Sequence, residues 1–128
     1  MLALAALLLA LQADPPPSTA PDAKAVFEER QEDLITLAGA LGGLHRLNQL
    51  CPGYGRVSIF RDRMKEIIDG EKPPRDTREQ MIANFNTGYR RMTRLHFTCS
   101  AQAEADFRSE ALAAYSVSEK LSAPLLVR

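Results

Sequence analysis

The sequence predicts an all-α protein: a four-helix antiparallel bundle-like domain stapled by one disulfide and preceded by a signal peptide and a proline-rich tether. From residue 22 onward, apolar residues recur every three or four positions, which is the spacing of helices with one buried face. The eight prolines all fall outside the proposed helices. Because the joints between helices are short, neighbouring helices should run antiparallel. The helical domain is expected over residues 22–124, followed by a tail at 125–128.

The first helix is expected from Asp22 to about Leu50. Its buried stripe follows a three-four repeat and consists of Phe27, Leu34, Leu37, Leu41, Leu44 and Asn48. Carboxylates near its start complement the positive end of the helix dipole; they are Glu28, Glu29, Glu32 and Asp33. The run Cys51-Pro52-Gly53 then ends the helix.

The second helix is expected over residues 57–68. It places Phe60, Met64, Ile67 and Ile68 on one face, and Gly70 ends it. Apolar and polar residues alternate at residues 57–59, so a short strand there is an alternative. The charged run that follows, at residues 61–66, fits a helix better than a strand.

Two further helices complete the domain. Pro73 and Pro74 precede the third helix, and Asp76 or Thr77 is expected to cap it by accepting free amide protons. The buried stripe of the third helix is expected to contain Ile82, Phe85, Tyr89, Met92, Leu95 and Cys99. Ser100 should cap the fourth helix, and Pro124 should end it. The fourth helix has a thinner apolar face made of Phe107, Ala111, Ala114, Val117 and Leu121.

The N-terminal segment indicates export. Residues 1–11 form an unbroken apolar run of eleven residues, whereas a membrane-spanning helix needs about twenty. Such a run ending in small residues is typical of a signal peptide, here residues 1–13 with cleavage near Ala13. A buried N-terminal helix is the alternative. Residues 14–21 hold four of the eight prolines and are predicted to form an extended tether. We therefore expect a periplasmic protein with no membrane span after cleavage.

The two cysteines, Cys51 and Cys99, are predicted to form a disulfide. In an exported protein an even pair of cysteines is typically bridged. Each cysteine should stand at the C-terminal end of a helix, and the first and third helices should be parallel, so the two sulfurs can meet. On the chain-entropy model such a bridge stabilises the fold by about 4 kcal/mol.

A zinc site is the alternative for the same cysteines. His45 and His96 each precede a cysteine, by six and three residues, so two sulfurs and two imidazoles are available. A six-residue spacing, however, points His45 away from Cys51 on a helix. We expect no metal and no cofactor.

Three glycines inside helices predict a close helix crossing. Gly39 and Gly43 are spaced by four on the first helix, and Gly88 lies within the third. Glycine inside a helix costs about 1 kcal/mol relative to alanine, so the missing side chains should serve a contact. If the disulfide aligns the helix ends, Gly39 and Gly88 lie at nearly equal height. The alternative is a homodimer seam through the same small residues.

The overall charge is zero, with sixteen basic and sixteen acidic residues, so no global field attracts nucleic acid or an anionic membrane. Two basic clusters nevertheless stand out. They are Arg90, Arg91 and Arg94 on the third helix, and Arg56, Arg61 and Arg63 near the second. We expect most of these side chains to be solvated or paired across helices. A site for an anionic envelope polymer is the alternative.

No catalytic residues can be assigned from the sequence. Two histidines at these positions do not assemble a nucleophile and a base with an orienting group, and no glycine-rich phosphate loop follows a strand. We therefore do not expect an enzyme.

Several segments together resemble a known family. They are residues 41–47 running to Cys51, residues 60–64, and the Phe-Asn-x-Gly-Tyr segment at 85–90 with Thr98-Cys99 downstream. Over about residues 33–121 the chain is similar to a small exported helical family of alphaproteobacteria, described as conserved hypothetical proteins. Members usually carry tryptophan where this chain has Phe60, a conservative departure. The resemblance implies a compartment and a bacterial lineage, and it implies no activity.

These observations favour a periplasmic interaction module that binds or regulates another cell-envelope protein. The polar members of the family-like segment are Asn86, Tyr89 and Arg90, and they are either binding residues or a buried hydrogen-bond network joining the first and third helices. An alternative function is a small chaperone or stress protein that exposes apolar surface in acid.

Overall fold

The computed structural model describes residues 22–53 and 55–123. It contains four α-helices, which are α1 (Ala23–Leu50), α2 (Ile59–Glu71), α3 (Arg75–Leu95) and α4 (Ala101–Ser122). No strand occurs among these residues, so the all-α, four-helix prediction is confirmed. The predicted signal peptide, tether and C-terminal tail lie outside the described residues. None of the described helices has the length and apolarity needed to cross a bilayer.

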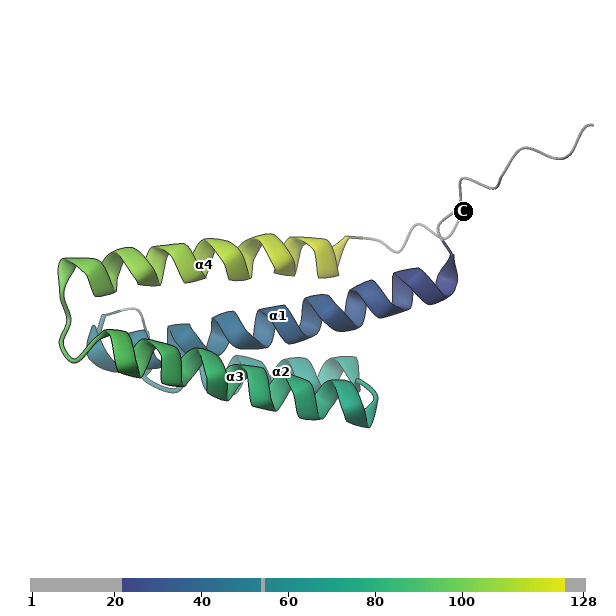
Figure 1. Cartoon of the computed structure of the whole chain (residues 1–128), viewed down its shortest axis with the longest axis horizontal. Helices are drawn as coiled ribbons and strands as arrows, with labels where there is room; N and C mark the ends of the chain where they lie inside the picture. The colour runs from purple at the N-terminus through teal and green to yellow at the C-terminus, as the bar shows by residue number, and fades with distance from the viewer. Residues whose placement is uncertain (1–21, 54, 124–128) are drawn as a thin grey trace, which may run out of the picture.

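The central helix is α1, which packs against each of the other three. α3 runs in the same direction as α1, whereas α2 and α4 run in the opposite direction (Figure 1). Most of the core therefore comes from one helix. Its most buried apolar side chains are Leu34, Leu37, Ala38, Leu41, Leu44 and Leu47, each 5% exposed or less.

Local capping explains where two of the helices begin. The Asp22 carboxylate accepts a hydrogen bond from the Lys24 amide at 3.1 Å, and the Ser100 hydroxyl accepts one from the Ala103 amide at 3.1 Å. Both side chains satisfy amides that have no partner within the helix. The predicted Ser100 cap is thus confirmed.

The other two helix starts differ from the prediction. α3 begins at Arg75 with Pro74 as its N-cap, so Asp76 and Thr77 lie inside the first turn instead of capping it. The fixed φ of Pro74 already leads the chain into the helix. α2 begins at Ile59, after the Ser58 hydroxyl donates to Asp62 at 2.9 Å, and the alternative strand at 57–59 is not formed.

The end of α2 also differs from the prediction. Gly70 lies within the helix, which continues to Glu71. Lys72 ends it by adopting a left-handed conformation with φ of 46°. The glycine therefore does not act as the terminator here, because the residue two positions later takes that conformation.

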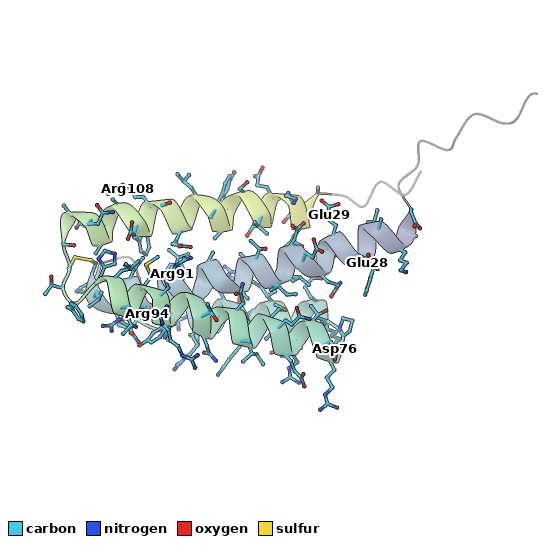
Figure 2. The ribbon with its side chains drawn as sticks, in the orientation of Figure 1. Glu28, Glu29, Asp76, Arg91, Arg94 and Arg108 are labelled. Atoms are coloured by element: carbon cyan, nitrogen blue, oxygen red, sulfur yellow. A yellow bond between two sulfur atoms is a disulfide. The ribbon has the colours of Figure 1, made fainter. Side chains whose placement is uncertain are left out.

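The disulfide joins Cys51, which caps the C-terminus of α1, to Cys99 in the joint between α3 and α4 (Figure 2). The two Cα atoms are 5.0 Å apart. The predicted pairing is confirmed, but Cys99 does not lie on α3, which ends at Leu95. The bridge thus fixes the α3–α4 joint against the end of α1.

The backbones of α1 and α3 touch at glycines. A Cβ on Gly88 would lie 2.1 Å from the Gly39 carbonyl oxygen and 3.0 Å from the Gly43 amide nitrogen. A Cβ on Gly42, a glycine absent from the predicted crossing, would lie 1.9 Å from the Phe85 carbonyl oxygen. A side chain at either position would therefore force the two helices apart.

The buried face of α3 agrees with the predicted stripe at Met92, and Phe85 packs partly buried against the core. The other buried residues are Thr77, Met81 and Gly88, whereas Ile82 is 44% exposed and Leu95 is 59% exposed. The prediction failed at Ile82 and Leu95 because it placed the largest apolar residues inward. The contact with α1 instead requires Gly88 to face inward, and this sets the rotation of the helix.

We predict that Gly88→Ala lowers the free energy of unfolding by about 2 kcal/mol, because the added methyl overlaps the α1 backbone. Gly70→Ala is the matched control, since a Cβ there meets nothing within 4 Å. The control substitution should raise the free energy of unfolding by about 0.5 kcal/mol, because alanine has a higher helix propensity than glycine. Urea unfolding of both variants measures the difference. Equal stabilisation by both would contradict the close crossing.

Replacing both cysteines by alanine should lower the free energy of unfolding by about 4 kcal/mol, the chain-entropy value for a sequence separation of 48 residues. Thermal melts with and without a reductant provide the measurement. A melting temperature indifferent to both changes would show that the bridge contributes nothing.

Candidate functional site

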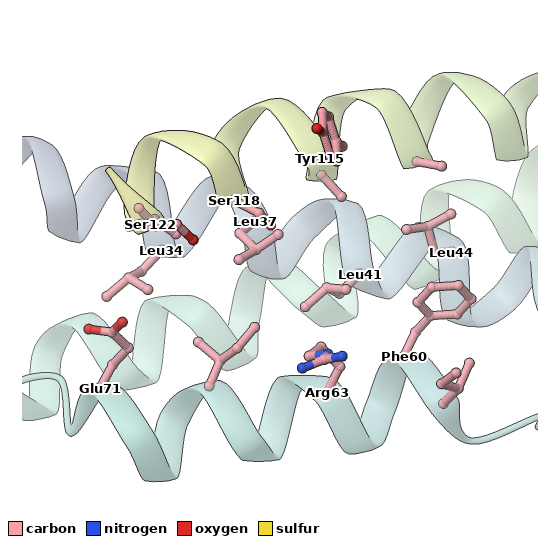
Figure 3. A pocket seen from close by; sticks show the side chains of 15 residues that line it. Leu34, Leu37, Leu41, Leu44, Phe60, Arg63, Glu71, Tyr115, Ser118 and Ser122 are labelled. Carbon is pink, nitrogen blue, oxygen red and sulfur yellow. The ribbon is translucent and has the colours of Figure 1, made fainter. Parts of the chain in front are cut away.

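Two hollows flank α2, and the larger one has a floor of buried side chains. It lies between α2 and α4, has a volume of about 540 Å³, and has Leu34, Leu37, Leu41 and Leu44 of α1 at its floor (Figure 3). These leucines are at most 5% exposed. A ligand would therefore gain little new apolar burial at this floor.

Both ends of this α2–α4 hollow are held by contacts between helices. At one end the Phe60 ring packs edge-on against Phe107, with 5.9 Å between centroids. At the other end the Arg30 guanidinium donates to the Glu71 carboxylate at 2.7 and 2.9 Å and to the Leu121 carbonyl at 2.9 Å. We interpret this hollow as a structural seam.

The second hollow, the α2–α3 groove, has a volume of about 440 Å³. Its lining consists of Arg61, Met64, Lys65, Ile68 and Asp69 from α2 and Arg78, Ile82, Phe85 and Asn86 from α3. Unlike the floor of the α2–α4 hollow, its apolar surface is partly open: Ile82 is 44% exposed, and Ile68 and Phe85 are partly buried. This groove therefore offers apolar surface that a partner could cover.

The groove is also positively charged. Arg61, Lys65 and Arg78 form no ion pair with any described residue, and Asp69 is the one acidic residue in the lining. Other cations bridge helices: Arg30 pairs with Glu71, Arg91 pairs with Glu110, and Lys120 contacts Asp33 at 3.0 Å. Arg46, Lys72, Arg90, Arg94 and Arg108 also form no ion pair with a described residue, but they lie outside the groove. The groove therefore combines three unpaired cations with open apolar surface.

His45 lies beneath this region of the fold. It is 8% exposed, and its ring centroid lies 5.9 Å from that of Phe85 and 5.7 Å from that of Tyr89. Burial, together with the nearby Arg61 guanidinium, lowers the pKa of His45. The imidazole is therefore neutral at pH 7, and it is held among aromatic rings.

The predicted polar network of Asn86, Tyr89 and Arg90 is not buried. Asn86 and Arg90 are exposed, and Asn86 lines the α2–α3 groove. Tyr89 does join the first and third helices, because its hydroxyl donates to the Gln49 side-chain oxygen at 2.8 Å. The buried-network interpretation is therefore wrong for Asn86 and Arg90.

Asn84, which was not among the predicted site residues, makes a second polar link between α1 and α3. Its side-chain amide donates to the Ile35 carbonyl at 2.8 Å, beside the Gly39 backbone. The sequence offered one signal for this role. Asn84 and Gly88 are four residues apart, so they share the face of α3 that meets α1.

The joint between α3 and α4 carries a second histidine. The His96 Nε2 atom lies 2.6 Å from the Asp106 carboxylate, and His96 is 7% exposed. Nearby, Arg91 pairs with Glu110; burial raises the pKa of that carboxyl, and the guanidinium opposes the shift. Within residues 22–53 and 55–123, no three potential metal ligands come together. These side chains tie α4 to α3.

The arginines of the two predicted basic clusters have different surroundings. Arg56 pairs with Asp62 at 3.6 Å and Arg63 with Glu66 at 3.3 Å, and Arg91 is also paired. Arg61 alone among them lines the α2–α3 groove, where it is joined by Lys65 and Arg78 from outside those clusters. The cations that lie together in the structure therefore come from both α2 and α3.

The fold and groove define a class of protein: a small helical domain, closed by one disulfide, with an open basic groove beside its shortest helix. The chain belongs to a family of proteins of unknown function, DUF2385, whose model matches residues 30–124. The match covers α2, α3, α4 and all of α1 beyond its first two turns. Among curated proteins and among solved structures, nothing matches the chain.

The pKa of His45 yields a pH prediction. Because folding lowers this pKa from 6.5, the unfolded chain binds the proton more readily, and stability falls as the pH drops through 6.5. We expect the free energy of unfolding to decrease between pH 8 and pH 5.5, and His45→Phe should reduce that decrease. Urea unfolding across this range is the measurement. An unchanged pH dependence in the variant would exclude His45 as its source.

Proposed function

We propose that this protein is an exported helical interaction module that binds another cell-envelope protein through the α2–α3 groove. One observation carries the proposal: three cations without ion-pair partners among the described residues surround partly exposed apolar side chains. A partner segment that suits this surface presents carboxylates on either side of an apolar stripe. Apolar contact then supplies affinity, and charge supplies orientation and selectivity.

The size of the groove suits a helix from a partner. Along α2 the lining runs from Arg61 to Asp69, and along α3 it runs from Arg78 to Asn86, so the last lining residue lies eight positions after the first in each case. At 1.5 Å per residue each wall is about 12 Å long, or roughly two helical turns. A helix lying in the groove would add a fifth element beside α2.

The proposed compartment is the periplasm. The apolar run of residues 1–11 and the small residues around Ala13 are typical of a signal peptide, and a structural disulfide is typical of an oxidising compartment. The resemblance to an exported alphaproteobacterial family also favours a periplasmic location.

We propose a binding role without catalysis. His45 is held between the Phe85 and Tyr89 rings, and His96 is bonded to Asp106, so neither imidazole is paired with a nucleophile among the described residues. An anionic polymer is less suited to this surface than a protein segment. The paired state of Arg56, Arg63 and Arg91 interrupts the basic tract that a polymer would follow.

A photo-crosslinking residue placed at Ile82 tests the proposal in cells. Ile82 lies in the groove, and Leu112, which is 70% exposed on α4, is the control site for another apolar surface. We expect an adduct with a second protein from position 82 and not from position 112. Arg61→Glu with Arg78→Glu should abolish the adduct, whereas Arg108→Glu, on α4, should not. Equal adducts from both positions, or none from position 82, would refute the groove as a binding surface.

A further inference from the structure

The first two turns of α1 project beyond the rest of the bundle (Figure 1). Arg30 contacts Glu71, the last residue of α2, and the Leu121 carbonyl near the end of α4. Residues N-terminal to Arg30 therefore extend past the ends of both neighbouring helices. We call this projection, together with the adjoining residues 30–32, the α1 tip (residues 23–32).

The α1 tip carries an apolar side chain that its own bundle does not cover. Phe27 was predicted to be buried, but it is 51% exposed. It lies seven residues before Leu34, so it continues the core-facing stripe of α1 past the point where α2 ends. An aromatic ring in this position has apolar surface available for a contact with another molecule.

The α1 tip is also acidic. Glu28, Glu29 and Glu32 are exposed near Phe27; Glu28 lies on the projecting end of α1, whereas Glu29 lies beside the end of α4 (Figure 2) and pairs with Lys120 at 3.7 Å. Glu28 has one partner among the described residues, Lys24 at 4.0 Å, in an exposed pair that contributes little. Glu32 forms no ion pair with a described residue. The tip therefore combines an open apolar ring with exposed carboxylates.

The α1 tip and the α2–α3 groove are complementary in charge, apolarity and length. Glu28 and Glu32 are four residues apart, as are Arg61 and Lys65. Two helices lying side by side with these spacings present two carboxylates to two cations at the same axial repeat. Phe27 then meets the apolar lining at Ile82 and Phe85.

We propose that the α1 tip of one copy occupies the α2–α3 groove of a second copy. If each copy inserts its tip into the other, the contact is repeated by a two-fold axis and closes as a dimer. The proposal rests on the proposed function in one respect, namely that this groove binds protein. It adds a form of regulation, because an envelope partner must displace the tip and thereby separate the dimer.

Charge reversal on the two surfaces tests the proposal with the mature, exported protein. The tip variant carries Glu28→Lys and Glu32→Lys, and the groove variant carries Arg61→Glu and Lys65→Glu. Arg94→Glu with Arg108→Glu is a control with two reversed charges outside the groove. All six side chains are exposed, so each variant should keep its helical circular dichroism spectrum.

In sedimentation velocity, wild type and the control should form dimers whose dissociation constant rises about tenfold or more between 50 and 500 mM salt. Each of the two test variants alone should be monomeric. Their equimolar mixture should restore the dimer, because the lysines of one tip then face the glutamates of the other groove. In the same mixed dimer, the native tip of the groove variant meets the native groove of the tip variant, so the second contact is unchanged.

A wild type that is monomeric at every concentration would overturn the dimer. So would a dimer that survives either reversal, or a mixture that fails to restore one. None of these results affects the proposed function, which is refuted separately by the absence of an Ile82 adduct to a different protein.

Discussion

The contact between the backbones of α1 and α3 determines which side chains of α3 are buried and which line the groove. Gly88 has to face α1, because the Gly39 carbonyl oxygen occupies the space that its side chain would fill. This requirement fixes the rotation of α3 about its own axis. Met81 and Met92 then point inward, while Ile82 and Asn86 turn toward α2 and line the groove. The lining of the groove is thus a consequence of a packing constraint on the opposite side of the helix.

The short helix α2 explains why hollows occur on both of its sides. It has 13 residues, whereas α1 has 28, so it covers part of the central helix only. On the α4 side the Phe60–Phe107 contact and the bonds of Arg30 bridge the two ends of the hollow. On the α3 side no comparable bridge is made between described residues that line the groove. Apolar and basic side chains therefore stay open there.

Overall neutrality conceals a strong segregation of charge. Cations that hold helices together have carboxylate partners, as Lys120 has in Asp33 and Arg91 has in Glu110. Arg61, Lys65 and Arg78 in the groove have none among the described residues, whereas the exposed carboxylates Glu28, Glu29 and Glu32 lie in the N-terminal part of α1. A protein whose net charge is zero can thus still have a strongly directional electrostatic field over about 10 Å, the screening length near physiological salt.

The amino-acid sequence by itself determined the four helices, the Ser100 cap and the pairing of Cys51 with Cys99. These depend on local periodicity, on capping chemistry and on the even number of cysteines, all of which can be read along the chain. The tertiary structure alone decided that Ile82 is exposed, that Asn84 links the helices and that Arg61 joins Lys65 and Arg78. The reason is physical. Periodicity specifies that a helix has one buried face, but the rotation of that face is set by contacts with residues about fifty positions away, such as Gly39 against Gly88.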